Sequence, residues 1–501
     1  MPLGLLASCD NGFEEMNVNP NASTEVVPGF LFTNAQLSTV NVNFTGSAYL
    51  TIGQSMQHFA TYKEVPAAGD KYFNFTYSTG AWNAYSGAVI QIQQVLDAVS
   101  KDPVDINKLS VTRIWKAYLF HRLTDLYGDV PYSDAGKALT EKNYTPKYDQ
   151  QSEIYADMLS ELEQAANAFD ESQPTFGNAD LIYGGDISKW KKFAYSLMLR
   201  LGMRLSEVDA DAAKMWVEKA IAGGVITDDA DIAVISYVDG SQTTSRNFIA
   251  SGLLATDYIT PGGDNVEGGK LAKTLIDHLK NTSDPRLNVI SIVWVPSGST
   301  LVADTTTELQ RGMPNAAFNS LPADFNSFSE PNPNTILKYN APLLVFTNAE
   351  VHLLLAEAAL RNWYSGATAE SSYREAVISG MKQWSLFGSA GIISDTKIEK
   401  YIAANPYKTG GTFDEQMEQI QTQKWVTLFL EDEYEIFSSW RRTGYPNLTP
   451  TNYPGNLTGG KIPTRFVVPD SEEIYNTDNF NEAVNRQGGT NTLSSVVWWD
   501  K

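Results

Sequence analysis

The sequence predicts a mostly α-helical protein that is built from helical hairpins, with long irregular loops and a minor β component. Apolar residues recur at i, i+3, i+4 and i+7 through residues 85–222 and 346–440, as on the buried face of a helix. The region between them, residues 225–345, is rich in Gly, Ser, Thr, Asn and Pro, which favours turns and loops. Successive helices with small residues at packing positions are typical of tetratricopeptide-type repeats, which bury their apolar faces on each other.

The clearest helix is predicted over residues 111–127. Its apolar stripe consists of Ile114, Trp115, Tyr118, Leu119, Leu123 and Leu126. Ser110 is predicted to cap its N-terminus. Gly128 suits the residue with positive φ that follows a helix, and Pro131 prevents the helix from continuing.

The remaining elements follow from the same patterns. Within 225–345 we expect one short helix near residues 270–280 and a strand over 288–295. Asn348 is predicted to cap the next helix. One helix is expected from about Phe413 to Trp440, and the tail after it reads as loop.

Composition and charge exclude several kinds of function. The net charge is −21, the pI is about 4.6, and the first lysine is Lys63. Nucleic-acid binding and attachment through a polybasic patch both need clustered Lys and Arg, so neither is expected. No stretch approaches the roughly 20 apolar residues of a transmembrane helix.

The cysteine and histidine content argues against a metal centre. Cys9 is the only cysteine, which rules out a disulfide framework and a Cys-based zinc site. The histidines are not spaced as in HExxH. The acidic stretch 228–231 could hold Ca²⁺, but it lacks the EF-hand pattern and is interpreted as a solvated turn. No cofactor is therefore expected.

Cys9 has a different predicted role. Leu6-Ala7-Ser8-Cys9 looks like a bacterial lipobox, in which the thiol is acylated and the preceding residues are removed. Residues 1–9 lack a basic start, so they are interpreted as the remnant of a signal peptide that begins upstream. Residues 10–28 read as a tether, and 29–501 as a single domain. Membrane attachment would then occur through the lipid alone.

Several motifs resemble one protein family. "LTDLYGDVPYSDA" around Gly128 resembles the signature of SusD/RagB-type outer-membrane lipoproteins of the Bacteroidetes. Three later stretches also resemble this family: "EVHLLLAEAALRNW", "QKWVTLFLEDEYEIFSSWRRTGYPNLTP" and "GGKIPTRFVVPDSEEIYNTDNFNEAV". Together with the lipobox, these motifs spread over most of the chain and occur in the family's order.

The resemblance implies a SusD-like fold and a nutrient-binding function. It implies capture of an oligosaccharide at the cell surface, transfer to a SusC-like TonB-dependent transporter, and no catalysis. An alternative within the family is a RagB-like member that captures peptides. More distant alternatives are a helical-toroid glycoside hydrolase and a scaffold without a small ligand. The acidic run 431–435 could suggest paired catalytic carboxylates, but the favoured interpretation is that these residues pair with Arg441 or Arg442 or face water.

Ligand binding to a sugar needs aromatic rings for stacking and polar side chains for its hydroxyls. Loops on a rigid scaffold are the usual location, so the loop-rich insertion 225–345 is predicted to lie on the ligand side. The residues predicted to contact a ligand are Tyr62, Tyr72, Phe73, Trp82, Asn83, Trp294 and Phe325. For Tyr72 and Phe73 the binding interpretation is favoured, because Gly and Asp residues nearby offer little core. For Trp82 core packing is favoured, and for Trp294 the two are balanced. His121, beside the apolar stripe, is interpreted as structural.

Overall fold

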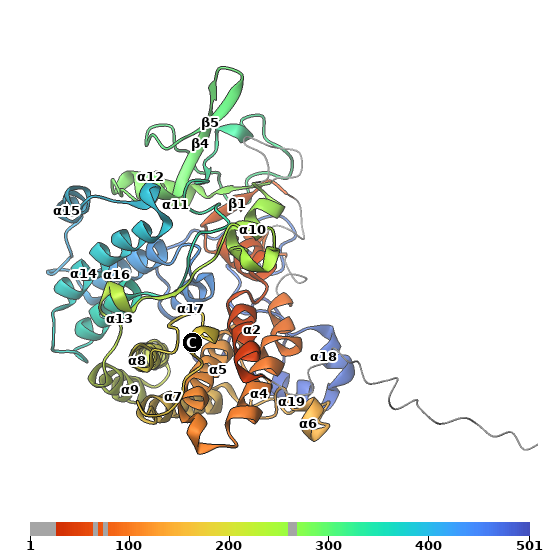
Figure 1. Cartoon of the computed structure of the whole chain (residues 1–501). Coiled ribbons are helices and arrows are strands. Elements are labelled where there is room, and N and C mark those ends of the chain that lie inside the picture. The colour runs from red at the N-terminus through yellow and green to blue at the C-terminus, as the bar shows by residue number, and fades with distance from the viewer. Residues whose placement is uncertain (1–26, 64–68, 74–78, 259–267, 501) are drawn as a thin grey trace, which may run out of the picture.

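The computed structural model describes residues 27–63, 69–73, 79–258 and 268–500 (Figure 1). Cys9 and nearly all of the predicted tether lie outside the described residues. Within the described part, no helix is both long and apolar enough to cross a bilayer.

The N-terminal half is a succession of antiparallel helices. Each long helix packs on the next long helix along the chain. They are α2 (Pro28–Val40), α4 (Ala88–Val99), α5 (Ile106–Tyr127), α7 (Gln151–Asn167), α8 (Ile187–Arg204) and α9 (Ala210–Gly223). A π-helical segment, Phe44–Gly53, follows α2, and the short α6 (Ala138–Glu141) precedes α7. These helices occupy the lower part of the view in Figure 1.

A second helical group follows the loop-rich region. Its members are α13 (Asn348–Leu360), α14 (Ala369–Lys382), α15 (Asp395–Ala404), α16 (Phe413–Thr427) and α17 (Glu433–Thr443). Helix α13 packs on α14, on α16 and on α8 of the first group. One hydrophobic core therefore extends through both groups, from Phe32 to Trp499. The predicted mostly α-helical, hairpin-based class is confirmed.

Strands are few and short, as expected. Antiparallel pairs join β1 (Phe59–Thr61) to β3 (Gly269–Leu271) and β2 (Ala233–Ile235) to β7 (Leu343–Phe346). A third sheet has β4 (Ser291–Ser297) between β5 (Thr300–Asp304) and β6 (Glu330–Pro331). The β4–β5 hairpin projects from the top of the molecule in Figure 1.

The loop-rich region also holds short helices. The predicted one is α11 (Lys273–Asn281), and two more that we did not predict are α10 (Phe248–Thr256) and α12 (Leu287–Ile290). Helix α11 borders a large cleft through Lys273, Thr274 and Asp277.

Several predicted helix boundaries are wrong. Helix α5 begins at Ile106, so Ser110 is an interior, buried residue and not the cap. Thr347, not Asn348, caps α13, and its hydroxyl accepts from the N–H of Glu350 at 3.3 Å. The helix expected over 413–440 is two helices, because Leu430 adopts a φ of 61° between them.

The tail predicted as loop contains two further helices. They are α18 (Asp470–Tyr475) and α19 (Thr477–Arg486), which carry charged and polar residues on most of their surface. Helix α18 is too short and too polar to show an apolar stripe in the sequence, and α19 offers only Phe480, Ala483 and Val484 at helical spacing.

The GDVPY segment joins α5, α7 and α19. Gly128 has a φ of 83°, and an added Cβ there would lie 1.8 Å from the amide oxygen of Gln487. That oxygen accepts from the N–H of Asp129 at 3.1 Å. The Asp129 carboxylate accepts from the N–H of Gln151 at 3.0 Å and from Arg486 at 2.9 Å. The predicted special role of Gly128 is confirmed, and the motif is structural.

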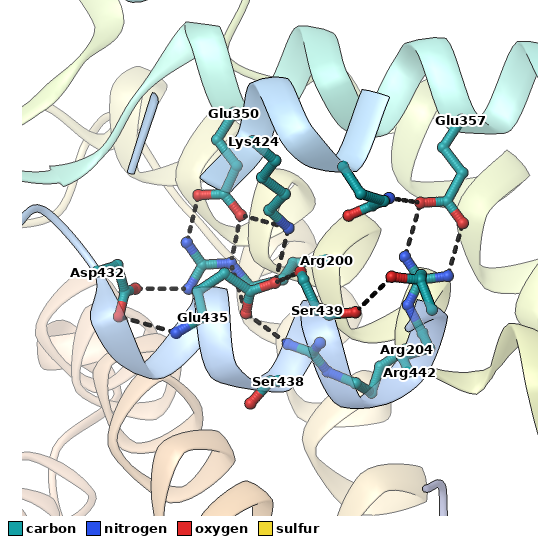
Figure 2. A network of polar contacts seen from close by, with 12 residues as sticks. Arg200, Arg204, Glu350, Glu357, Lys424, Asp432, Glu435, Ser438, Ser439 and Arg442 are labelled. Carbon is teal, nitrogen blue, oxygen red and sulfur yellow. Dashed lines mark hydrogen bonds and ion pairs between the residues drawn. The ribbon is translucent and has the colours of Figure 1, made fainter. Parts of the chain in front are cut away.

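A buried ion-pair network connects α8, α13, α16 and α17 (Figure 2). Arg200 donates to both oxygens of Glu350, at 2.9 and 2.5 Å, and to Asp432 at 3.3 Å. Glu435 accepts from Arg204 and from Lys424. Since unpaired buried charges are strongly unfavourable, these pairs fix the relative positions of the four helices.

A second branch of this network lies further along α13. Arg442 forms a two-pronged pair with Glu357, with both contacts at 2.6 Å. Glu357 also accepts from Arg361 at 2.9 Å and from Gln421 at 2.8 Å. The neighbouring Arg441 lies instead over the rings of Phe437 and Trp499. The acidic run 431–435 is thus structural, as expected. The prediction that it pairs with Arg441 or Arg442 is wrong, because Arg442 pairs with Glu357 and Arg441 packs on aromatic rings.

Candidate functional site

A large cleft of about 970 Å³ lies between the loop 314–319, the loop 449–454 and the start of α11. This volume is in the range of ligand-binding clefts. The residues around it combine rings, amides and hydroxyls, and they include Gln57, Lys273, Thr274, Asp277, Asn315, Phe318, Asn319, Thr451, Asn452 and Tyr453.

Gln57 holds one side of the cleft together. It lies at the end of the helical segment after α2, has a φ of 59°, and is buried. Its amide nitrogen donates to the carbonyl of Thr449 at 2.6 Å, while its amide oxygen accepts from the hydroxyl of Thr274 at 2.6 Å. One side chain therefore joins α11 to the loop 449–454.

Asp70 lies beneath the cleft and touches both loops. Its carboxylate accepts from the N–H of Ala316 at 2.9 Å. Its backbone carbonyl accepts from the hydroxyl of Thr451 at 2.5 Å. Burial raises the pKa of Asp70 to about 6, against the lowering effects of the Ala316 N–H and of Lys71.

An aromatic group supports the loop 449–454. The ring of Tyr453 lies edge-on to that of Phe73, with centroids 6.0 Å apart. The ammonium group of Lys71 lies 5.1 Å from the centre of the Tyr453 ring. Tyr453 is half-buried, so part of its ring borders the cleft.

The opposite loop offers a second ring and amide groups. Phe318 is half-buried beside Phe328, with centroids 6.3 Å apart. Asn319 and Asn452, one on each loop, are exposed at the cleft. Half-exposed rings together with carboxamides are the groups that bind sugars, the rings by stacking and the amides by hydrogen bonds to hydroxyl or acetamido groups.

Two predicted ligand residues lie at this cleft, in different ways. Phe73 supports Tyr453, as described. Tyr72 is 1% exposed, and its phenol oxygen accepts from the N–H of Thr451 at 3.1 Å. The expectation of an accessible ring at Tyr72 is corrected, because its ring is enclosed and only its hydroxyl holds the cleft loop.

Tyr62 and Phe325 pack against each other, with centroids 5.1 Å apart and the rings nearly perpendicular. Phe325 is 2% exposed and lies under the ammonium group of Lys270. They belong to a small separate core with Met313, next to the cleft loop 314–319. Phe325 therefore packs in this small core and presents no ring face to a ligand.

The other predicted residues lie away from the cleft. Trp82 is 7% exposed and packs edge-on to Tyr127, with centroids 4.9 Å apart, so the core interpretation holds. Asn83 beside it is exposed. Trp294 is half-buried on β4, and its indole N–H donates to Glu330 at 2.8 Å. Neither Trp82 nor Trp294 borders the 970 Å³ cleft.

The sequence reasoning missed Phe318, Asn319, Asn452 and Tyr453. The region 225–345 was identified as the ligand side, and "PNAAFNS" within it contains two of them. "PTNYPGN" contains the other two, but it lies in the C-terminal tail, for which the sequence predicts only loop. An aromatic residue flanked by Asn and Pro in both loops is a signal that could have identified the pair.

A smaller cavity of about 430 Å³ continues from the cleft past Thr274. His278 on α11 borders it, and burial lowers the pKa of His278 below its usual value. Tyr373 and Trp425 form part of its buried wall.

The stretch 228–231 forms a short 3-10 turn. Asp231 pairs with Lys192 at 2.6 Å, and Asp229 accepts from Asn348 at 2.8 Å. Across the described ranges, no three or more His, Cys, Asp or Glu residues are grouped so that they could hold a metal ion.

His121 is buried in α5, and its Nε2 lies 3.3 Å from a guanidinium nitrogen of Arg200. Because arginine only donates, this contact places the ring proton of a neutral His121 on Nδ1. The structural interpretation of His121 agrees with this position.

Comparisons with known proteins agree with the fold. The chain is 32% identical to a chitin-binding protein of known structure, with a TM-score of 0.82, covering 95% of this chain and 100% of that one. It is 26% identical to a SusD-like protein from Bacteroidetes AC2a, with a TM-score of 0.83 and the same coverage. A chitin-binding SusD homologue from Flavobacterium johnsoniae shares the fold at 22% identity, with a TM-score of 0.77 over 94% of this chain and 98% of that one.

No functionally curated protein matches this chain. The family model described as "Starch-binding associating with outer membrane", SusD-like, matches residues 20–469. That range includes the helical groups, the cleft loops and the GDVPY segment. The chain belongs to the SusD-like family of outer-membrane-associated, starch-binding-type proteins.

Proposed function

We propose that this protein is a cell-surface nutrient-binding lipoprotein that captures chitin-type oligosaccharides in the 970 Å³ cleft. The observation that carries this proposal is that one cleft is lined by an aromatic ring and a carboxamide from each of two loops, Phe318 and Asn319 on one and Tyr453 and Asn452 on the other. The 32% identity to a chitin-binding protein supports the choice of glycan.

The chemistry of the cleft fits a neutral glycan with amide substituents. Phe318 and Tyr453 would stack on the apolar faces of successive sugar rings, and Asn319 and Asn452 would bond to acetamido groups. The only cleft charges among the described lining residues, Lys273 and Asp277, pair with each other. A neutral ligand would therefore meet no uncompensated charge in this part of the cleft.

The finer cellular role is part of the same proposal. Acylation at Cys9 would hold the protein at the outer membrane, and a SusC-like TonB-dependent transporter would receive the glycan. The lipobox-like tetrad and the outer-membrane association of the family support it. Capture without catalysis is proposed, because Asp432 and Glu435 are held in buried ion pairs and the buried Glu433 carboxylate is hydrogen-bonded to His58.

Isothermal titration calorimetry tests the proposal. The full chain with Cys9→Ala, which cannot be acylated, would be titrated with chitohexaose, maltohexaose and a tryptic peptide mixture, with reducing ends assayed in the same samples. Binding of chitohexaose without new reducing ends supports the proposal. Binding of maltohexaose or peptides alone refutes the choice of chitin, and new reducing ends refute the binding-only function.

A further inference from the structure

Both walls of the cleft are fastened to one residue, Asp70. The wall 314–319 is held through the Asp70 carboxylate, which accepts from the N–H of Ala316 at 2.9 Å. The wall 449–454 is held through the Asp70 carbonyl, which accepts from Thr451 at 2.5 Å. Gln57 has a different role, because it joins the second loop to α11.

The contact to Ala316 holds a backbone conformation that an L-residue rarely adopts. Ala316 has a φ of 52°, in the left-handed region. A non-glycine residue in that region is unfavourable, so it persists only where neighbouring contacts fix it. The hydrogen bond from the Ala316 N–H to Asp70 is such a contact. Asn315 adds a second one, because its amide donates to the carbonyl of Phe59 at 2.7 Å.

The Asp70 carboxyl group is 1% exposed, and its second oxygen has no hydrogen-bond partner among the described residues. The charged and titratable groups that act on it are Lys71, which favours its ionised form, and Tyr72, whose phenol lies on the side of Thr451. The Lys71 ammonium donates to the backbone of Tyr62 and Lys63 and lies over Tyr453. Burial raises the pKa of Asp70 to about 6, so both forms are accessible between pH 5 and 7.5.

We propose that Asp70 is a positioning residue for the ligand cleft: its carboxylate holds the 314–319 loop against the 449–454 loop, and protonation loosens the cleft and weakens ligand binding. The inference rests on the proposed glycan-binding function of this cleft. A hydrogen bond to a carboxylate is roughly twice as strong as one to a neutral carboxyl group. Phe318 and Tyr453 line the cleft from different loops, so the distance between their rings depends on how far apart the two loops lie.

The test is the pH profile of chitohexaose affinity, measured by calorimetry on the full chain with Cys9→Ala. Chitohexaose has no group that titrates between pH 5 and 8. We expect the dissociation constant to rise about fivefold from pH 7.5 to pH 5, which is the effect of weakening one charge-assisted hydrogen bond. Asp70→Asn keeps the shape and one acceptor but removes the charge. Its affinity is expected to equal the low-pH value of the parent at every pH.

His278→Gln is the matched control. His278 is a titratable residue of α11 that borders the adjoining cavity and not the cleft itself. It is expected to keep the parent's pH profile. A parent profile that is flat from pH 5 to 7.5 would overturn the inference. So would an Asp70→Asn variant that retains the pH dependence, or a His278→Gln variant that loses it.

Hydrogen exchange tests the inference without any ligand. The protection factor of the Ala316 amide is expected to fall from pH 7.5 to pH 5 in the parent and to be low at both pH values in Asp70→Asn. If chitohexaose does not bind but this change is observed, the ligand assignment fails and the positioning role stands. If chitohexaose binds but Ala316 protection is independent of pH, the positioning role fails and the proposed function stands.

Discussion

Substitution of Glu357 by Gln should show how strongly the buried ion pairs stabilise the fold. Glu357 is 0% exposed and accepts four hydrogen bonds, from Arg442 twice, from Arg361 and from Gln421. These partners outweigh burial and lower the pKa of Glu357 from 4.5 to about 2. A shift of this size corresponds to about 3 kcal/mol of stabilisation at neutral pH. Loss of one partner from a buried ion pair typically costs 3–5 kcal/mol, which agrees.

Differential scanning calorimetry would measure the effect. For 501 residues, an unfolding entropy of about 2.1 cal/mol/K per residue gives about 1 kcal/mol per degree. Glu357→Gln is therefore expected to lower the Tm by about 3 °C if the chain unfolds as one unit. Glu218→Gln is the control: Glu218 is 52% exposed and lies 3.8 Å from Lys214, and surface pairs contribute little.

The pH dependence gives a second check on the same pair. Because the folded-state pKa of Glu357 is lowered, its stabilisation is fully present above pH 4.5 and is lost as the pH falls toward about 2. The Tm difference between parent and Glu357→Gln should be constant from pH 6 to 8 and should shrink below pH 4.5. A shift no larger than that of Glu218→Gln at pH 7 would refute the reasoning.

Three further predictions concern a turn, the cleft and a buried histidine. Gly128→Ala should lower the stability by about 1–2 kcal/mol in urea unfolding, because alanine resists a φ of 83° and its Cβ would displace the Gln487 amide; an unchanged midpoint would contradict this. Tyr453→Ala should raise the chitohexaose dissociation constant about tenfold in calorimetry, because a stacking ring is lost. Tyr144→Ala is the control and should have no effect, because the Tyr144 ring is 74% exposed and lies outside the cleft. Burial and neighbouring arginines hold the pKa of His121 well below its usual value, so the unfolded chain binds a proton below pH 6.5 that the folded chain does not. Stability should therefore fall by roughly 1 kcal/mol from pH 7.5 to 5.5, and by less in His121→Gln, as measured by urea unfolding at both pH values.

Local pattern was enough to predict the long helices and the turn at Gly128. It failed where a partner distant in sequence decides the outcome. Leu430 interrupts the helix expected over 413–440, and there Glu433 turns back to accept from the Leu430 N–H at 3.1 Å and pairs with His58 at 2.9 Å. The apolar pattern of residues 413–440 gives no indication of the contact between Glu433 and His58, because the two residues are far apart in the sequence.

The cleft shows the same division. The segment containing Tyr72 and Phe73 is predicted to contact a ligand, since aromatic residues in a loop of Gly and Asp have little core to join. The sequence could not show which ring is enclosed. That outcome depends on the loop 449–454, which folds back so that Thr451 donates to Tyr72 and Tyr453 meets Phe73. The two segments are separated by more than three hundred residues.

The ion-pair network has a consequence for how such a protein can diversify. Its charges lie on or next to α5, α8, α13, α16 and α17, and none of them belongs to the described residues that line the cleft. Substitutions at Phe318, Asn319, Asn452 or Tyr453 would leave every one of these pairs intact. The scaffold and the recognition surface therefore draw on separate side chains, so new ligand preferences can arise in the loops while the folded framework keeps its stability.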